Sequence, residues 1–289
     1  MKTVLITGAS SGFGLLTTKL LLLRGCRVFA GIRNLFGKNK AIADDLVHWS
    51  SDKIGMLTLC EMDVTNDQQV QHVAKLIEDT VGTVDVLINN AGVWPVGQSE
   101  CFTEDQFRNI LDINLLGIHR TCRAIIPLMR KHKKGLIIHM SSQSARIASP
   151  FLGLYASTKA AGDMLMEAMK YELKPFGINI VIVQPGTYQT GLFNNALTPA
   201  DEARKKEYGA FSHIESGIVS YINQSFSQIT SRPEEVAEQI LKIIQTNGSG
   251  SETRVVIDPH PSAGIRTQVE LINNISEKVT EKIALSMNL

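Results

Sequence analysis

The chain has 289 residues, of which 44% are hydrophobic and 20% are charged, and its formal net charge is +1. A folded chain of this length buries about three quarters of its unfolded surface, so we expect a large core. The near-neutral charge argues against a basic surface that binds nucleic acid or an acidic membrane. The longest apolar run near the start, at 20–23, is closed by Arg24, so we expect no integral membrane segment.

Four cysteines, at positions 26, 60, 101 and 122, are widely separated and form no CxxC pair. This spacing is typical of reduced residues in the core of a cytoplasmic protein. His119 and His139 have no neighbouring pattern of metal ligands, so we expect no metal site. The composition favours a cytoplasmic enzyme or a small-molecule binding protein.

The elements predicted along the chain alternate between strands and helices. Short β-branched runs predict strands at 3–7, 27–32, 54–62, 84–90, 135–141, 178–184 and 253–258. Most of these runs are apolar throughout, which is typical of strands buried on both faces. Helical stretches lie between them, including 13–24, 67–80, 104–132 and 154–174. The alternation predicts an α/β fold with a doubly wound, parallel, seven-stranded sheet of the Rossmann type.

Capping residues support the predicted boundaries. Thr65 or Asn66 can cap the helix at 67–80, and Thr103 can cap the one that follows. Pro175 ends the helix that begins near Tyr155. No linker divides the chain, so we expect one catalytic domain over 1–264.

Two segments fall outside the regular alternation. Residues 187–231 are too long for an ordinary loop and predict a substrate lid. Residues 265–289 predict a C-terminal helical extension of the same domain, because apolar residues recur there at helical spacing, namely Val269, Ile272, Ile275, Val279 and Ile283.

The sequence TGASSGFG, residues 7–14, directly follows the first strand and opens the first helix. Glycines in this position let the backbone turn sharply and approach a pyrophosphate, whose charge meets the helix N-terminus. The turn therefore predicts a dinucleotide site formed by Gly8, Ser10, Ser11, Gly12, Phe13 and Gly14.

The end of the second strand reads AGIRN and carries no acid. Folds of this kind that hold NAD usually place an acid there to bind the ribose 2′-hydroxyl. Arg33 would instead pair with a 2′-phosphate, so we predict NADP(H) in preference to NAD(H). The alternative is that Arg33 is only a solvated surface residue.

With TGASSGFG, NNAG at 89–92, a serine thirteen residues before Tyr155, YASTK at 155–159 and PGTYQT at 185–190, the chain resembles the short-chain dehydrogenase/reductase family. It is similar to the single-domain branch, over about two thirds of its length. The turn VFAGIRN adds a weaker resemblance to the steroid and retinol dehydrogenases.

The resemblance implies a role for each matched residue. The catalytic residues would be Asn114, Ser142, Tyr155 and Lys159. The cofactor would contact the glycine turn, Arg33, Asp63, Val64, Asn90, Ala91, Gly92, Tyr155, Lys159, Pro185, Gly186 and Thr190. The residues alone leave Ser141 as an alternative to Ser142, and Asp63 could instead cap the next helix. The resemblance also implies a homodimer or homotetramer.

The chemistry implied is hydride transfer by the cofactor, with Tyr155 as general acid or base. To work as a base near neutral pH, Tyr155 would need a pKa about three units below its usual value near 10, or roughly 4 kcal/mol. Lys159 lies one helical turn away on the same face, and a charge at about 4 Å contributes an effect of this size. We therefore expect Lys159 to lower the pKa of Tyr155.

Apolar residues at the carboxyl ends of the strands predict a pocket for an apolar carbonyl or secondary alcohol, lined by Trp94, Val96, Ile147, Phe151, Tyr188 and Phe193. An alternative enzyme is a 3-oxoacyl thioester reductase. An alternative of another class is a non-catalytic, NADP(H)-sensing binding protein that keeps the fold without turnover.

Overall fold

The computed structural model of the chain describes residues 1–226, 232–250, 252–258, 270–271, 273–275 and 278. Seven parallel strands form one sheet in the order β3-β2-β1-β4-β5-β6-β7. The strands are β1 Thr3–Thr7, β2 Arg27–Ile32, β3 Met56–Glu61, β4 Val86–Asn89, β5 Gly135–Met140, β6 Ile178–Pro185 and β7 Arg254–Ile257. The predicted doubly wound sheet is confirmed, and its strand order reverses between β1 and β4.

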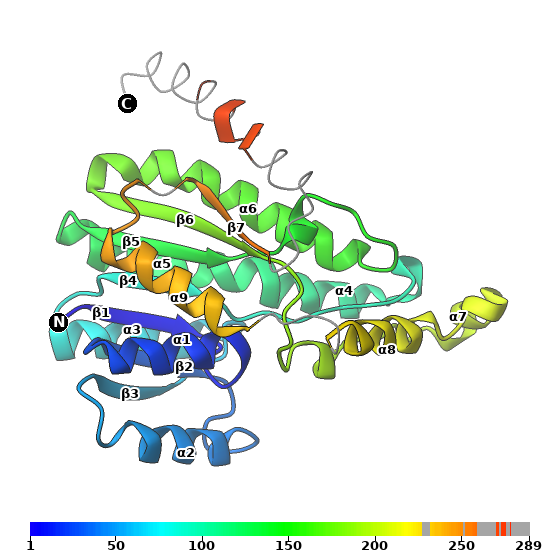
Figure 1. The fold of residues 1–289 in the computed structure, drawn as a ribbon, viewed down its shortest axis with the longest axis horizontal. Helices are drawn as coiled ribbons and strands as arrows, with labels where there is room; N and C mark the ends of the chain where they lie inside the picture. The colour runs from blue at the N-terminus through cyan, green and yellow to red at the C-terminus, as the bar shows by residue number, and fades with distance from the viewer. Residues whose placement is uncertain (227–231, 251, 259–269, 272, 276–277, 279–289) are drawn as a thin grey trace.

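Helices cover both faces of this sheet (Figure 1). Hydrophobic side chains of α1, α2 and α9 join one core cluster, and those of α3, α5 and α6 join a second cluster on the opposite face. The helices are α1 Gly12–Leu23, α2 Lys40–Ser50, α3 Asp67–Val81, α4 Glu104–Leu111, α5 Gly117–Lys131, α6 Gly153–Leu173, α7 Glu202–Glu207, α8 Ile214–Phe226 and α9 Glu234–Gln245. Burial on both faces explains why the strands are apolar throughout.

Side-chain caps hold the helix boundaries that the sequence predicted. The Asn66 side chain accepts a hydrogen bond from the backbone of Gln69 at the start of α3. Thr103 and Gln106 form a reciprocal capping box at the start of α4. The four cysteines have free thiols and are buried, as expected.

The helix predicted over 104–132 is present from Glu104 to Lys131, but it is not α-helical throughout. The chain instead forms α4, a π-helical turn at Asp112–Leu116, and α5. The turn contains Asn114, whose side chain bonds the backbone of Val93. In this turn the backbone hydrogen bonds span five residues instead of four. The buried amide of Asn114, which is bonded to the loop after β4, accounts for this local change.

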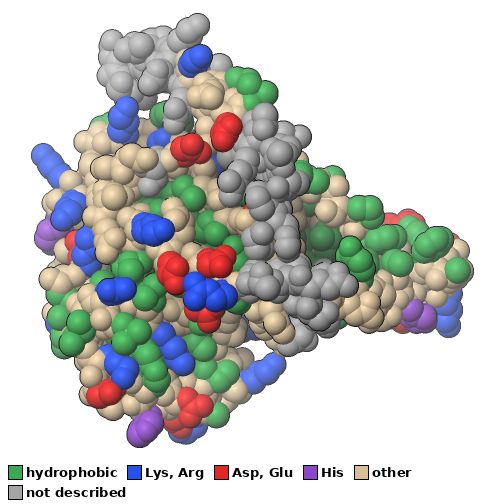
Figure 2. All heavy atoms as spheres, viewed as in Figure 1, with side chains coloured by type: hydrophobic (Ala, Val, Ile, Leu, Met, Phe, Trp, Pro, Cys, Tyr) green, Lys and Arg blue, Asp and Glu red, His purple; other side chains and the backbone are tan. Residues whose placement is uncertain are grey.

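The segment predicted as a lid contains α7 and α8, which project as an arm from the side of the sheet where the strands end (Figure 1). Hydrophobic side chains gather along this arm in Figure 2. The buried Lys205 joins the two helices, because its Nζ lies 3.0 Å from Glu202 Oε1 and 2.8 Å from Glu215 Oε1.

Most of the predicted C-terminal helix lies outside the described residues, including Val269, Ile272, Val279 and Ile283. The end of the predicted lid, 227–231, lies outside them as well. Over the part of the chain that the structure describes, no helix has the length and apolar character needed to cross a membrane.

Candidate active site

A cavity of about 910 Å³ opens where the strands end, and it joins the glycine turn to the start of α6. Most of the residues predicted for the site line this cavity: Gly8, Ser10, Ser11, Gly12, Phe13, Arg33, Asp63, Val64, Asn90, Ala91, Gly92, Ser142, Tyr155, Lys159, Pro185, Gly186 and Thr190. The carboxyl end of a parallel sheet beside the reversal of strand order is where open α/β folds bind ligands.

The glycine turn has the shape that a dinucleotide needs. Gly8 and Gly12 adopt positive φ angles of 67° and 52°, a conformation that side chains disfavour. A Cβ on Gly14 would overlap the backbone oxygen of Gly8, so Gly14 packs behind the turn and does not line the cavity. The Asn90 amide supports the turn from β4, donating to Thr7 O at 2.9 Å and Gly8 O at 3.1 Å. The residues present therefore fit a pyrophosphate.

The far end of the cavity carries the two cations Arg33 and Lys38. The turn that bears Arg33 is held by Glu61, whose carboxylate accepts hydrogen bonds from the backbone of Asn34 at 2.9 Å and Leu35 at 2.7 Å. Sequence reasoning missed Lys38 and Glu61, because Lys38 lies in the turn between β2 and α2 and Glu61 reaches that turn from the end of β3.

Asp63 does not cap α3, because Asn66 takes that position. Asp63 lines the cavity, and its Oδ1 also accepts hydrogen bonds from the backbone nitrogen and the hydroxyl of Thr65, at 2.9 and 2.8 Å. This Asx turn precedes α3 without capping it, and a cofactor contact at Asp63 stays a prediction.

The side chains at the centre of the cavity come from different elements. Tyr155 and Lys159 lie one turn apart on α6, with the Lys159 Nζ 5.7 Å from the centre of the Tyr155 ring. Ser142 follows β5 and its hydroxyl accepts a hydrogen bond from Ser144 N at 3.1 Å. Asn114 does not line the cavity, because its amide is engaged by Val93 and by the Thr158 hydroxyl.

The expected lowering of the pKa of Tyr155 is not found. Burial raises the pKa of Tyr155 to about 12, and the hydroxyl of Ser142 offsets this only in part. Burial also lowers the pKa of Lys159 to about 8, which weakens the positive charge that was expected to stabilise the phenolate. The protein alone therefore keeps the Tyr155 proton at neutral pH.

The two neighbouring serines face different partners. Ser142 interacts with the Tyr155 hydroxyl and lowers its pKa. Ser141 interacts with Asp163 on the next turn of α6 and lowers the pKa of that carboxyl. Both serines line the cavity, so the choice between Ser142 and Ser141 as the substrate contact stays a prediction.

Of the predicted substrate residues, four line the cavity and two do not. Trp94, Ile147, Tyr188 and Phe193 line it, whereas Val96 and Phe151 do not. Val96 is fully buried beneath Trp94, and the Phe151 backbone oxygen accepts a hydrogen bond from Gly97 N at 2.9 Å. These two residues support the pocket from behind.

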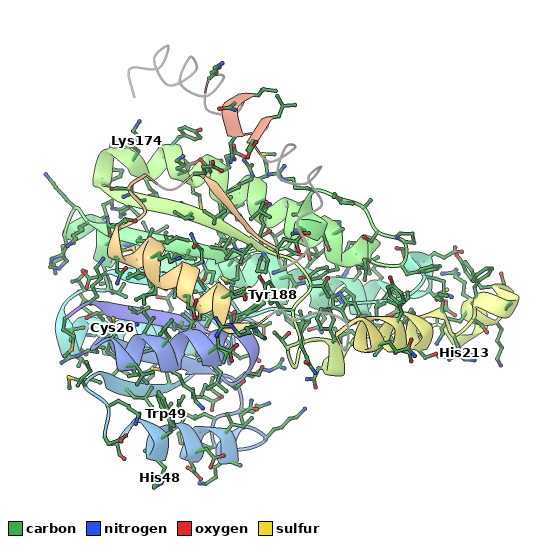
Figure 3. The ribbon with its side chains drawn as sticks, in the orientation of Figure 1. Cys26, His48, Trp49, Lys174, Tyr188 and His213 are labelled. Atoms are coloured by element: carbon green, nitrogen blue, oxygen red, sulfur yellow. The ribbon has the colours of Figure 1, made fainter. Side chains whose placement is uncertain are left out.

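Tyr188 and the arm define the apolar end of the cavity. Tyr188 lies at the root of the arm near the start of α9, far from His213 (Figure 3), and its ring packs edge-on against Phe13. Ile218 and Val219 of α8 pack on the cluster that contains Trp94 and Tyr155. No local pattern predicted this contact, because α8 is about sixty residues from Tyr155 in a segment without a clear periodicity.

Comparisons with known proteins identify the family of the chain. A family model described as short chain dehydrogenase matches residues 2–200. The chain is 35% identical over 192 residues to a 3-ketodihydrosphingosine reductase of Bacteroides thetaiotaomicron, covering 66% of each chain. It is 31% identical over 247 residues to the uncharacterized oxidoreductase YusZ of Bacillus subtilis, covering 84% of each. A solved short-chain dehydrogenase from Streptomyces avermitilis superposes with a TM-score of 0.76 at 27% identity, covering 100% of this chain and 99% of that one.

Proposed function

Since the chain belongs to the short-chain dehydrogenase family and is an oxidoreductase of CH–OH and C=O groups, we propose that it interconverts an apolar carbonyl compound and its secondary alcohol with NADP(H). Tyr155 is the general acid or base of this reaction. The proposal rests above all on one observation: Ser142, Tyr155 and Lys159 share a cavity with the glycine turn.

The nicotinamide cofactor, held by the glycine turn, Asn90 and the Pro185–Thr190 segment, supplies or accepts the hydride when it is bound. In the reductive direction, the Tyr155 hydroxyl donates its proton to the carbonyl oxygen of the substrate. Ser142 hydrogen-bonds the same oxygen and so orients it beside Tyr155. Lys159 stabilises the phenolate that remains until a proton from solvent replaces the one donated.

The protonation state of Tyr155 favours carbonyl reduction. Burial keeps Tyr155 protonated at neutral pH, and a general acid must begin the reaction with its proton in place. For oxidation Tyr155 would first have to lose this proton. Forming the phenolate in this buried position costs free energy, and a further positive charge in the site would reduce that cost.

The preference for NADP(H) is supported by the charge at the far end of the cavity. Arg33 and Lys38 both line it there, and either can hydrogen-bond a phosphate. The nearby carboxylate of Glu61 is engaged by two backbone N–H groups, which leaves the two cations to meet a 2′-phosphate.

An apolar substrate is supported by the residues around Tyr155. The substrate end of the cavity is formed by Trp94, Ile147, Leu152, Leu192, Phe193, Ala196 and Leu197. Among the residues that line the cavity, Lys159 is the only cation at this end, so nothing there matches a substrate phosphate or carboxylate. A 3-oxoacyl thioester on a phosphate-bearing carrier is therefore disfavoured. The relative named 3-ketodihydrosphingosine reductase makes apolar ketones a sensible first choice.

The proposal is tested by following NADPH absorbance with a panel of ketones, aldehydes, steroids, retinoids and acyl thioesters. We expect turnover of an apolar ketone or aldehyde and weak or no turnover of anionic thioesters. Tight NADPH binding without turnover of any member would reject catalysis and favour the NADP(H)-sensing alternative. A preference for acyl thioesters would reject the apolar assignment.

The cytoplasmic location and the homodimeric or homotetrameric assembly implied by the resemblance stay predictions. Cell fractionation tests the first, and sedimentation velocity of the purified chain tests the second.

A further inference from the structure

A buried polar stripe continues from the catalytic pair along α6. Tyr155, Lys159, Asp163 and Glu167 follow one another at intervals of four residues, and each is at least 93% buried. Residues four apart lie on the same side of a helix, so the stripe faces the sheet. Two of its members are acids, which rarely occur in a core without a partner or a function.

Glu167 has a full partner. Its carboxylate pairs with the guanidinium of Arg254, a fully buried residue of β7. Each charge is thereby compensated locally, as buried ion pairs require.

Asp163 is held less closely, although only 1% of it is exposed: its ion pair with Arg146 is long and is not hydrogen-bonded. Its Oδ2 accepts one hydrogen bond, from Gln184 Nε2 at 2.6 Å, and its Oδ1 accepts none. Arg146 Nη2 lies 3.8 Å from Oδ2, beyond hydrogen-bond distance. A buried carboxylate in this position costs free energy unless a nearby positive charge compensates for the lost hydration.

His139 does not compensate Asp163. Its Nε2 lies 3.7 Å from Asp163 Oδ1, and neither ring nitrogen has a hydrogen-bond partner. Burial and the charge of Lys159 lower the pKa of His139 to about 3, so the imidazole is neutral at neutral pH. The remaining cation on the stripe is Lys159, one turn from Asp163 on the same face.

Lys159 needs a nearby negative charge. It is buried, and its Nζ donates a hydrogen bond of 2.8 Å to a neutral acceptor, Met140 O. Burial lowers the pKa of Lys159, and Asp163 is the charge that raises it again. Burial raises the pKa of Asp163, while Ser141, Arg146, Gln184 and Arg254 lower it and favour the carboxylate.

We propose that Asp163 is a positioning residue that keeps Lys159 in its ammonium form, with the hydrogen bond from Gln184 and the ion pair with Arg146 holding the carboxylate in place behind the catalytic pair. This role rests on the proposed function, because the ammonium serves the reaction by stabilising the Tyr155 phenolate. The groups that face Asp163 come from β5, β6, β7, α6 and the turn after β5: His139, Ser141, Gln184, Arg254, Lys159, Glu167 and Arg146.

The test is a direct titration of Lys159 that requires neither substrate nor cofactor. The whole chain is labelled with ¹⁵N at the lysine Nζ, the Lys159 signal is assigned by its loss in Lys159→Met, and its shift is followed against pH. In Asp163→Asn we expect the titration midpoint to fall by about one pH unit or more, because the neighbouring opposite charge is removed. A midpoint unchanged from the wild type would overturn the proposal.

Two controls separate this effect from a general loss of stability. Glu172→Gln removes an exposed acid from the same helix and should leave the midpoint of Lys159 unchanged. Asp163→Ser is a second variant, smaller than Asn, for use if the first does not fold, and it should shift the midpoint in the same direction. An equal shift in Glu172→Gln would overturn the proposal, because the effect would then not be specific to Asp163.

The activity of the same variants distinguishes the two proposals. If the wild type reduces an apolar ketone, Asp163→Asn should lower kcat more than it raises KM, since Asp163 does not line the cavity. If the wild type reduces nothing in the panel, the proposed function fails, while the titration still decides whether Asp163 sets the charge of Lys159.

Discussion

Asn114 bonds the backbone of Val93 at both ends of its amide: Oδ1 accepts from Val93 N at 2.8 Å, and Nδ2 donates to Val93 O at 3.0 Å. This paired contact ties the π-helical turn between α4 and α5 to the loop after β4. Trp94 follows Val93 directly, so the contact also sets where the wall of the cavity lies.

Replacing Asn114 should therefore destabilise the protein as well as the site. In Asn114→Ala the Val93 N–H and C=O lose their partner, and we expect the free energy of unfolding to fall by about 2–4 kcal/mol. Urea denaturation measures the change. Asn109→Ala, at an exposed position of α4, should change stability by less than about 1 kcal/mol. Equal effects of the two variants would contradict a special role for the paired contact.

Removing the Tyr155 hydroxyl should abolish turnover without unfolding the protein. In Tyr155→Phe we expect kcat to fall by about 10²–10⁴, because the proton donor is lost, while NADPH binding is retained. Initial rates and NADPH fluorescence titration measure the two quantities. Tyr171→Phe is the matched control, since Tyr171 lies on the same helix and its buried hydroxyl has no hydrogen-bond partner. Near-normal activity of Tyr155→Phe would reject the assignment.

The two neighbouring serines should differ in their effect on catalysis. Ser142 interacts with Tyr155, so we expect Ser142→Ala to lower kcat/KM about 100-fold through the loss of a hydrogen bond to the substrate oxygen. Ser141 interacts with Asp163, so Ser141→Ala should cause a loss at least about tenfold smaller. Steady-state kinetics with the best ketone of the panel compares them, and the reverse order would identify Ser141 as the substrate contact.

Arg33 should determine the preference between the two nicotinamide cofactors. In Arg33→Ala we expect the Kd for NADPH to rise about 10- to 100-fold, the loss typical of a hydrogen bond to a charged group, while the Kd for NADH stays unchanged. Calorimetric titration of both cofactors measures the ratio. Arg24→Ala removes an exposed arginine at the end of α1 and should alter neither value. A wild-type protein that binds NADH more tightly than NADPH would refute the NADP(H) assignment.

His139 should make the protein sensitive to acid. Its pKa is lowered to about 3 in the folded chain, whereas an unfolded histidine titrates near 6.5, so below pH 6.5 the unfolded chain binds one proton more. Stability from this group is present above pH 6.5 and is lost as the pH falls toward 3, at about 1.4 kcal/mol per pH unit.

Urea denaturation between pH 4 and 7 measures this slope. His139→Gln should reduce the slope by about 1.4 kcal/mol per pH unit, even if the variant is less stable overall. His72→Gln, at an exposed position of α3, should keep the wild-type slope. Parallel stability curves for the wild type and His139→Gln would show that His139 does not carry the acid sensitivity.

Much of the fold could be predicted from local patterns. All seven strands were found within two residues of their observed ends, because each is a short apolar run bounded by polar residues or glycine. The helices α2 and α9 were missed. In α2 only Ala43 and Leu46 are buried, and α9 follows a segment whose pattern was assigned to the lid. The π-helical turn was also missed, because its cause is a contact with Val93, twenty-one residues away.

The candidate site was predictable where its residues belong to contiguous motifs. The glycines of TGASSGFG allow the positive φ angles that the turn needs. The spacing of four in YASTK places Tyr155 and Lys159 on the same face of a helix. Lys38, Glu61 and Ile218 were missed because no local pattern marks them. Val96 and Phe151 were placed in the pocket because sequence shows that a residue is apolar but not which way its side chain points.

By itself the sequence determined the parallel sheet, the glycine turn and the spacing of Tyr155 and Lys159, because strand burial, backbone freedom and helix pitch act between residues near in the chain. The tertiary structure decided the protonation of Tyr155, the different surroundings of Ser142 and Ser141, and the burial of Asp163 behind Lys159. These properties depend on the loss of water and on charges from distant strands, and both arise only when the chain has folded.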